Sequence, residues 1–132
     1  MGITSQPQIL TQATDAYVNT GTTGKIQNFS GVNGATTYTV TNGAVIRLNT
    51  FTSNTSITFT GVPYNSSTGV TYYWNIWYVD VVQPGSYTVT FNGILWDGGV
   101  APTFTSNKRS LVQFYSPDGG TTIYGKQLFV AV

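Results

Sequence analysis

The side chains able to carry acid-base or metal chemistry are few in this chain of 132 residues. Histidine, cysteine and glutamate are absent, so the usual general base, the thiolate nucleophile and the commonest zinc ligands are missing. Four carboxylates remain, each on a different segment: Asp15, Asp80, Asp97 and Asp118. Two carboxylates acting as acid and base would have to be brought together by folding. The composition therefore favours a protein that is not an enzyme.

Two aspartate-glycine-glycine segments raise the question of a metal site. Asp97-Gly98-Gly99 and Asp118-Gly119-Gly120 each offer one carboxylate. A calcium ion takes six to eight oxygen ligands, often from several closely spaced carboxylates, so a segment with one aspartate provides too few of these ligands. Aspartate and glycine are also typical of turns, where glycine supplies positive φ angles. We interpret both segments as turns and expect neither a metal nor another cofactor.

Charge-driven partners are also disfavoured. Only 7% of the residues are charged and the formal net charge is +1, so no strong electrostatic field would attract nucleic acid or an anionic membrane. No stretch approaches the roughly 20 apolar residues of a membrane-spanning helix, and Met1 to Leu10 lacks the pattern of a secretion signal. We expect a soluble protein that is not exported by the usual route and that binds neither nucleic acid nor a membrane.

The chain from Lys25 onward has the composition and periodicity of β-strands. In Ser86 to Phe91, for example, Tyr87, Val89 and Phe91 share one face and hydroxyl side chains share the other. One face of such a strand is buried and the other faces water. The predicted strands are Ile26 to Phe29, Thr36 to Thr41, Ala44 to Phe51, Ser56 to Thr60, Thr71 to Val82, Ser86 to Phe91, Arg109 to Tyr115 and Thr121 to Val130.

Three turn motifs predict how these strands connect. Asn42-Gly43 and Asp118-Gly119-Gly120 supply the residues of tight hairpins, and Gln83-Pro84-Gly85-Ser86 fits a turn with proline second and glycine third. Hairpins join antiparallel strands. The sequence therefore predicts an all-β domain over residues 25–132, an antiparallel, jelly-roll-like β-sandwich without internal repeats.

Residues 1–24 precede this domain and are predicted to form an arm. Pro7 comes early, apolar residues are sparse, and Asn19 to Gly24 is typical of a loop. Two interpretations stay open. The arm is a frayed terminus or short edge strand, or it extends over a neighbouring subunit and adds a strand to a foreign sheet edge. Its apolar anchors in the second case are Ile3, Ile9, Leu10, Tyr17 and Val18.

The segment Thr71 to Val82 does not alternate between apolar and polar residues. Both of its faces carry aromatic or aliphatic side chains, as in a central strand that is covered on both sides. In a small domain, however, one face is more easily covered by another subunit, or it stacks on a sugar. We favour subunit contact, because only Asn75 and Asp80 would assist sugar recognition. The candidate interface residues are Tyr72, Tyr73, Trp74, Trp77 and Tyr78, together with Ile3, Ile9 and Leu10 of the arm.

Arg47 is the one charged residue in the predicted strand Ala44 to Phe51. It pairs with one of the four aspartates, or it extends into solvent from a half-buried position. The sequence favours the second interpretation, because long basic side chains readily place their charge in water while their stems cover apolar surface.

The second half of the chain carries a longer pattern. Pro84 to Phe91 is followed by Leu95-Trp96-Asp97-Gly98-Gly99-Val100-Ala101-Pro102, and Leu111 to Tyr115 leads into Asp118-Gly119-Gly120-Thr121-Thr122-Ile123-Tyr124-Gly125. This order of a Trp-x-Gly-Gly-x-x-Pro loop, a strand and an Asp-Gly-Gly-Thr-Thr-x-Tyr-Gly hairpin resembles β-domains of bacteriophage tail-fibre and other virion structural proteins.

The resemblance implies a structural protein of the virion surface, assembled in the host cytoplasm. A short chain with an arm suits a capsid decoration (cement) protein that binds and stabilises the major capsid protein, and the resemblance favours a homotrimer. The alternative is a tail-fibre or tail-tip protein that binds host surface glycans. In both cases we expect the motif residues to determine the fold rather than to bind a ligand: Trp96, Gly98, Gly99, Pro102, Asp118, Gly119 and Gly120.

Overall fold

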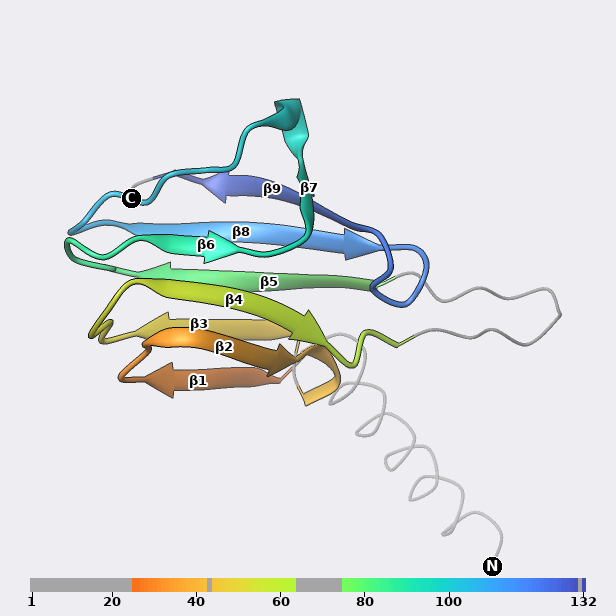
Figure 1. The fold of residues 1–132 in the computed structure, drawn as a ribbon, viewed down its shortest axis with the longest axis horizontal. Helices are drawn as coiled ribbons and strands as arrows, with labels where there is room; N and C mark the ends of the chain where they lie inside the picture. The colour runs from red at the N-terminus through yellow and green to blue at the C-terminus, as the bar shows by residue number, and fades with distance from the viewer. Residues whose placement is uncertain (1–24, 43, 64–74, 131) are drawn as a thin grey trace, which may run out of the picture.

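The computed structural model describes residues 25–42, 44–63, 75–130 and 132, and within these ranges the chain is all-β, as predicted. Two short 3-10 turns, η2 (Val40–Asn42) and η3 (Asp97–Gly99), interrupt the strands. No helix in the described part is long and apolar enough to cross a membrane. The strands are β1 (Ile26–Ser30), β2 (Gly34–Thr39), β3 (Val45–Asn49), β4 (Thr55–Thr60), β5 (Asn75–Val82), β6 (Val89–Phe91), β7 (Ile94–Trp96), β8 (Arg109–Ser116) and β9 (Ile123–Phe129) (Figure 1).

The first six strands alternate between two sheets. The larger sheet has the order β1-β3-β5-β8-β9-β7 and the smaller one β2-β4-β6 (Figure 1). Strands β1 to β4 each pair in parallel with the strand two places further along the chain, so that Ile26 lies beside Val45 and Gly34 beside Thr55. The chain therefore winds through three stacked turns, each with one strand per sheet, which is the connectivity of a β-solenoid.

The parallel turns correct the predicted antiparallel jelly roll, in which hairpins connect neighbouring strands. Asn42-Gly43 lies between β2 and β3, and Gln83-Pro84-Gly85-Ser86 lies between β5 and β6, but each pair of strands belongs to different sheets. The residues of a turn determine that the chain changes direction, but they do not determine which of the two sheets the next strand joins. The sequence analysis also found no internal repeat, although the structure contains one. Successive turns are stacked in a parallel register, but equivalent positions carry different residue types, so the repeat is not visible in the sequence.

The third predicted hairpin is confirmed. The segment Asp118-Gly119-Gly120 lies between β8 and β9, which pair antiparallel, and β8 also pairs antiparallel with β5. The last strands of the larger sheet therefore change from parallel to antiparallel pairing. The short strand β7, which was not among the predicted strands, pairs in parallel with β9 at the edge of this sheet.

Both sheets contribute to one core. Phe59 of the smaller sheet packs against both Trp77 and Phe114 of the larger sheet, with ring centroids 5.3 Å and 4.7 Å away, and it stacks on Phe91 at 6.0 Å. Trp77 and Phe114 have no exposed surface. Rings packed at these distances and angles add roughly 0.5–1.5 kcal/mol per pair to the stabilisation from burial. The aromatic residues thus join the two sheets near the middle of the molecule.

Gly125 in β9 allows β7 to lie close to the core. A Cβ atom at this position would be 2.7 Å from Ile94 Cγ2 and 2.7 Å from Trp96 Cζ3. Trp96 in turn packs against Phe91 and Phe114, with centroids 5.9 Å and 5.8 Å away. Any side chain at residue 125 would therefore displace the Trp96 ring from the core.

We predict that Gly125→Ala lowers the free energy of unfolding by about 2 kcal/mol, because overpacking a close contact typically costs 1–3 kcal/mol. In a Trp96→Ala background the same substitution should cost less, since the contacts with the Trp96 ring are gone and only the contact with Ile94 Cγ2 remains. Urea unfolding of the four proteins in this double-mutant cycle measures the coupling. Equal costs in both backgrounds would show that the Trp96 ring does not require glycine at residue 125.

Candidate interaction face

The outer face of the smaller sheet is polar and carries small side chains. Thr37 of β2 lies beside Thr58 of β4, and Ser56 lies beside Thr90 of β6. Asn92 Nδ2 donates hydrogen bonds to Ser56 Oγ (2.7 Å) and Thr58 Oγ1 (3.0 Å). These hydroxyl and amide groups satisfy one another and face water, as expected for the wet side of a half-buried sheet.

The outer face of the larger sheet is different and carries large apolar side chains in water. Ile26, Leu95 and Phe129 are 55%, 56% and 57% exposed, and Tyr124 is 46% exposed. Ile26 and Leu95 come from the two edge strands, β1 and β7, and Tyr124 and Phe129 come from β9, which lies beside β7 (Figure 1). We call this side the outer aromatic face and define it by Ile26, Arg47, Tyr78, Asp80, Tyr115, Tyr124 and Phe129.

An ion cluster lies at the centre of the outer aromatic face. Asp80 of β5 accepts a hydrogen bond from Arg47 Nε of β3 at its Oδ2 (3.0 Å) and from Arg109 Nε of β8 at its Oδ1 (2.7 Å), and Arg109 Nη2 also donates to Oδ2. The side chain of Asp80 is only 8% exposed. Burial raises the pKa of this carboxyl group, but the hydrogen bonds from Arg109 and Arg47 outweigh burial and hold the pKa below its usual value.

The cluster decides between the two interpretations of Arg47. Pairing with an aspartate is confirmed, and extension of an unpaired charge into solvent is wrong. The reason is the register of β3 and β5, which places Arg47 directly beside Asp80 on the same face. The two residues are far apart in the sequence, and local patterns contain no signal for a parallel pairing of these strands.

Two tyrosines form a second feature of the outer aromatic face. Tyr115 of β8 and Tyr124 of β9 are cross-strand partners whose rings stack at 5.9 Å with an interplanar angle of 20°. They line a hollow of about 330 Å³ together with Leu95, Gln113 and Lys126. Aspartate 97 lines the same hollow, and its carboxylate lies 3.6 Å from Lys126 Nζ. The hollow therefore offers a ring surface beside several polar groups.

The predicted interface residues are only partly described. Trp77 is corrected, because it is fully buried in the core and presents no surface to a partner. Tyr78 is half-buried on the outer aromatic face, where its hydroxyl oxygen accepts a hydrogen bond from Gln113 Nε2 at 3.3 Å. Alternation along β5 explains the difference, since neighbouring residues point to opposite sides of the sheet. The other six candidates lie outside the described residues: Tyr72, Tyr73, Trp74, Ile3, Ile9 and Leu10.

Sequence reasoning missed much of this face. Ile26, Leu95, Tyr124 and Phe129 were not candidates, although each alternates with a more buried neighbour or lies at a strand end. The alternation of Ile123, Tyr124 and Gly125 contained a usable signal, because an exposed tyrosine lies between two buried residues. The sequence did not show that these four residues share one face, because that depends on which strands lie side by side in the sheet.

The motif residues occupy turns and core edges. Gly98 and Gly99 have φ angles of 73° and 74°, and Gly119 and Gly120 have 70° and 92°, which glycine adopts without strain. Pro102 lies with Trp96 and Phe104 beside a hollow of about 420 Å³ next to β6. These positions fit the expectation that the motif shapes the backbone.

Each aspartate that the structure describes has a structural partner. Asp118 Oδ1 accepts hydrogen bonds from the backbone N–H of Thr122 at 2.7 Å and from Ser116 Oγ at 3.2 Å, so it closes the β8–β9 turn. Asp80 holds two arginines, and Asp97 lies beside Lys126. Among the described residues no three aspartates gather into a possible metal site.

Comparison with known proteins finds no relative of this chain. No protein-family model matches the chain, no curated protein matches it, and no solved structure matches it. The interpretation of function therefore depends on the described surfaces and on the sequence pattern.

We predict that Asp80→Asn lowers the free energy of unfolding at pH 7 by about 2 kcal/mol, because each hydrogen bond to a charged group contributes roughly 1.5–3 kcal/mol. Asp97→Asn is the matched control. Its side chain and that of Lys126 are 66% and 61% exposed, so we expect a loss of at most about 1 kcal/mol. Urea unfolding measures both losses, and equal losses would contradict a special role for the Asp80 cluster.

The same cluster predicts a pH dependence. The pKa of Asp80 is lower in the folded protein than in the unfolded chain, so its stabilisation is complete above about pH 4 and is lost as the pH falls through the folded value. The difference in unfolding free energy between the native chain and Asp80→Asn should therefore shrink on acidification. The lowered pKa of Asp118, held by hydrogen bonds from Thr122, is common to both proteins and cancels. A difference that stays constant down to about pH 2 would refute this assignment.

Proposed function

We propose that this chain is a non-enzymatic structural protein of a bacteriophage virion, a capsid decoration protein that binds and stabilises the major capsid protein. The observation that carries the proposal is the outer aromatic face, where Tyr115, Tyr124, Ile26 and Phe129 meet water on one side of a single sheet. Large exposed apolar areas on small proteins mark surfaces that bind other proteins. The sequence resemblance supplies the virion surface as the place of action.

The chemistry of the face suits a permanent contact between proteins. Tyrosine and arginine are enriched in protein interfaces, and lysine and glutamate are depleted. Both arginines at the centre already share Asp80, so a partner can cover them without leaving an unpaired charge. In the part of the chain that the structure describes, the outer positions of the smaller sheet carry small polar side chains in place of such anchors and are suited to remain in water. The two sheets around one core then act as a sandwich-like module that presents one adhesive side.

The resemblance also favours a homotrimer on the capsid. Three copies around a symmetry axis would place three outer aromatic faces against neighbouring capsid subunits, and many weak contacts would combine into a stable attachment. Light scattering of the purified chain measures its oligomeric state directly. A monomer at every concentration would remove the trimer from the proposal and leave the capsid contact to be tested by itself.

We predict that the double variant Tyr124→Ser/Phe129→Ser binds capsids lacking this protein at least about tenfold more weakly than the native chain, because buried aromatic anchors commonly contribute 2 kcal/mol or more to binding. Thr37→Ala/Thr58→Ala on the opposite side is the control and should bind normally. Co-sedimentation with capsids and the temperature of capsid disruption give two readouts. Normal binding by the outer-face variant would overturn the proposal.

The second candidate function is that of a tail-fibre or tail-tip protein that binds host surface glycans. The Tyr115–Tyr124 stack beside Gln113, Lys126 and Asp97 favours it, since an aromatic surface next to polar groups suits a sugar ring and its hydroxyls. This function predicts that Tyr124→Ala abolishes adsorption to host cells, and Tyr87→Ala, another exposed tyrosine, is the control. Images of intact particles separate the two functions, because decoration requires many copies over the capsid and a tail role few copies at the tail.

A further inference from the structure

The ion cluster on the outer aromatic face carries more positive than negative charge. Arg47 and Arg109 share the single carboxylate of Asp80, so each arginine is paired, but the three side chains together keep a surplus positive charge. In the part of the chain that the structure describes, neither arginine has a second acidic partner. A protein that covered the cluster with apolar groups alone would therefore bury a net charge, which is costly.

The two guanidinium groups meet at one oxygen of Asp80. Arg47 Nε and Arg109 Nη2 both donate hydrogen bonds to Oδ2, and Arg109 Nε donates to Oδ1. A guanidinium group has more N–H donors than these bonds use. The side chains of Arg47 and Arg109 are 36% and 48% exposed, whereas that of Asp80 is 8% exposed. The cluster therefore presents its remaining donors to solvent and keeps its carboxylate below them.

A small apolar hollow lies directly beside the cluster. It measures about 190 Å³, and Leu111, Phe129 and Val132 line it together with Asp80 and Arg109. Phe129 is 57% and Val132 is 71% exposed, so a partner can reach these apolar side chains. The register of β5, β8 and β9 explains the arrangement, because Asp80, Leu111 and Phe129 are successive cross-strand neighbours. A group bound to the arginines is therefore next to a site for an apolar side chain.

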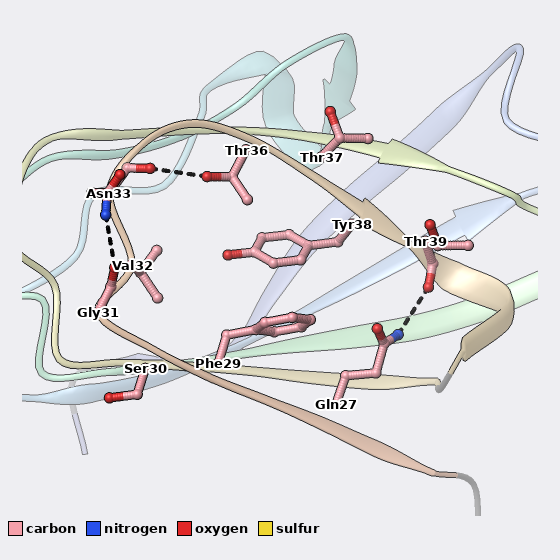
Figure 2. A pocket seen from close by; sticks show the side chains of 10 residues that line it. All are labelled: Gln27, Phe29, Ser30, Gly31, Val32, Asn33, Thr36, Thr37, Tyr38 and Thr39. Carbon is pink, nitrogen blue, oxygen red and sulfur yellow. Dashed lines mark hydrogen bonds between the residues drawn. The ribbon is translucent and has the colours of Figure 1, made fainter.

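Two other hollows that the structure describes offer no such surplus of charge. The hollow between β1 and β2 is lined by neutral residues, and Gln27 Nε2 in it already donates a hydrogen bond to the carbonyl oxygen of Thr39 at 2.9 Å (Figure 2). The hollow beside the stacked tyrosines contains Lys126 and Asp97, whose opposite charges balance each other. The hollow at the ion cluster differs from both, because it combines apolar walls with a positive charge.

We propose that the outer aromatic face binds its protein partner through an acidic side chain of that partner, an aspartate or a glutamate, held between Arg47 and Arg109. The carboxylate accepts hydrogen bonds from the donors that Asp80 leaves unused, and it balances the surplus charge. An aliphatic side chain next to the acid fills the hollow beside the cluster. This inference rests on the proposed function, in which the partner is the major capsid protein.

The charge and the shape of the site favour a protein carboxylate over other anions. Nucleic acid is bound by many basic side chains that each neutralise a phosphate, and this cluster has a small surplus charge. Inorganic phosphate would contact the arginines but leave the apolar hollow empty. An acidic residue followed by an aliphatic one satisfies both parts of the site.

The direct test is a titration with the blocked dipeptide acetyl-Glu-Leu-amide, followed by NMR. We expect saturable shifts of the backbone amide signals of Arg109 and Leu111. The neutral dipeptide acetyl-Gln-Leu-amide should bind at least about tenfold more weakly, because hydrogen bonds to a charged acceptor are the stronger ones. No response, equal binding of the two dipeptides, or tighter binding of inorganic phosphate would each overturn the proposal.

Arg47→Gln and Lys126→Gln form a charge-matched pair of variants. Each removes a positive charge from a salt bridge on the same side of the molecule, and in Arg47→Gln the carboxylate of Asp80 keeps its bonds to Arg109. We expect Arg47→Gln to bind the acidic dipeptide and the capsids at least about tenfold more weakly. Lys126→Gln should bind both like the native chain, since its exposed pair contributes little. Thermal unfolding verifies that both variants are folded.

The two probes separate failure of this inference from failure of the proposed function. If the acidic dipeptide binds through Arg47 but the native chain does not bind capsids, the proposed function is wrong and the acid-binding site is supported. If the native chain and Arg47→Gln bind capsids equally well, the acid-binding site is wrong and the capsid contact is retained. Added salt should also weaken capsid binding by the native chain more than by Arg47→Gln, because salt screens the attraction between charges.

Discussion

The parallel stacking of turns is the constraint on which the rest of this structure depends. Residues at equivalent places in successive turns lie one above another, as Phe29, Leu48 and Val81 do, so the core is built of columns rather than of isolated contacts. Each turn buries its inner side chains only if the next turn is in register. The register therefore determines at once which residues form the core and which reach the two outer faces.

The change from parallel to antiparallel pairing ends this repetition. Strand β5 pairs with β3 in parallel on one side and with β8 in the antiparallel sense on the other. Asp80 lies at this junction and binds Arg47 from the parallel part and Arg109 from the antiparallel part. One largely buried carboxylate thus connects the stacked turns to the C-terminal strands, where its two hydrogen-bonded partners offset the cost of burying a charge.

The two outer faces follow from the different origins of the sheets. The smaller sheet contains only strands from the turns, and its outer positions carry threonine and serine. The larger sheet also contains β8 and β9, which bring Tyr115, Tyr124 and Phe129 to the side that already carries Ile26 and Tyr78. Adhesive side chains are therefore concentrated on one side of a nearly uncharged molecule. This asymmetry supports a role in binding neighbours better than any single residue does.

Glycine at residue 125 shows how a local pattern can hide a tertiary requirement. In the sequence it ends a motif and has no evident role, whereas in the structure it gives space to the side chains of Ile94 and Trp96. The strand β7 that brings them there is short, and its pairing with β9 in parallel was not predicted. The signal for such a contact lies in the distance between two strands, which no stretch of neighbouring residues encodes.

The sequence by itself determined the all-β class, the placement of Trp77 and Tyr78 on opposite faces of β5, and the hairpin at Asp118. These features depend on alternation and turn chemistry, which act over a few residues. Only the tertiary structure decided that the first six strands pair in parallel, that Arg47 meets Asp80, and that Trp77 is core. Hairpins and crossovers satisfy backbone hydrogen bonds equally well, so the choice depends on packing between residues far apart in the chain.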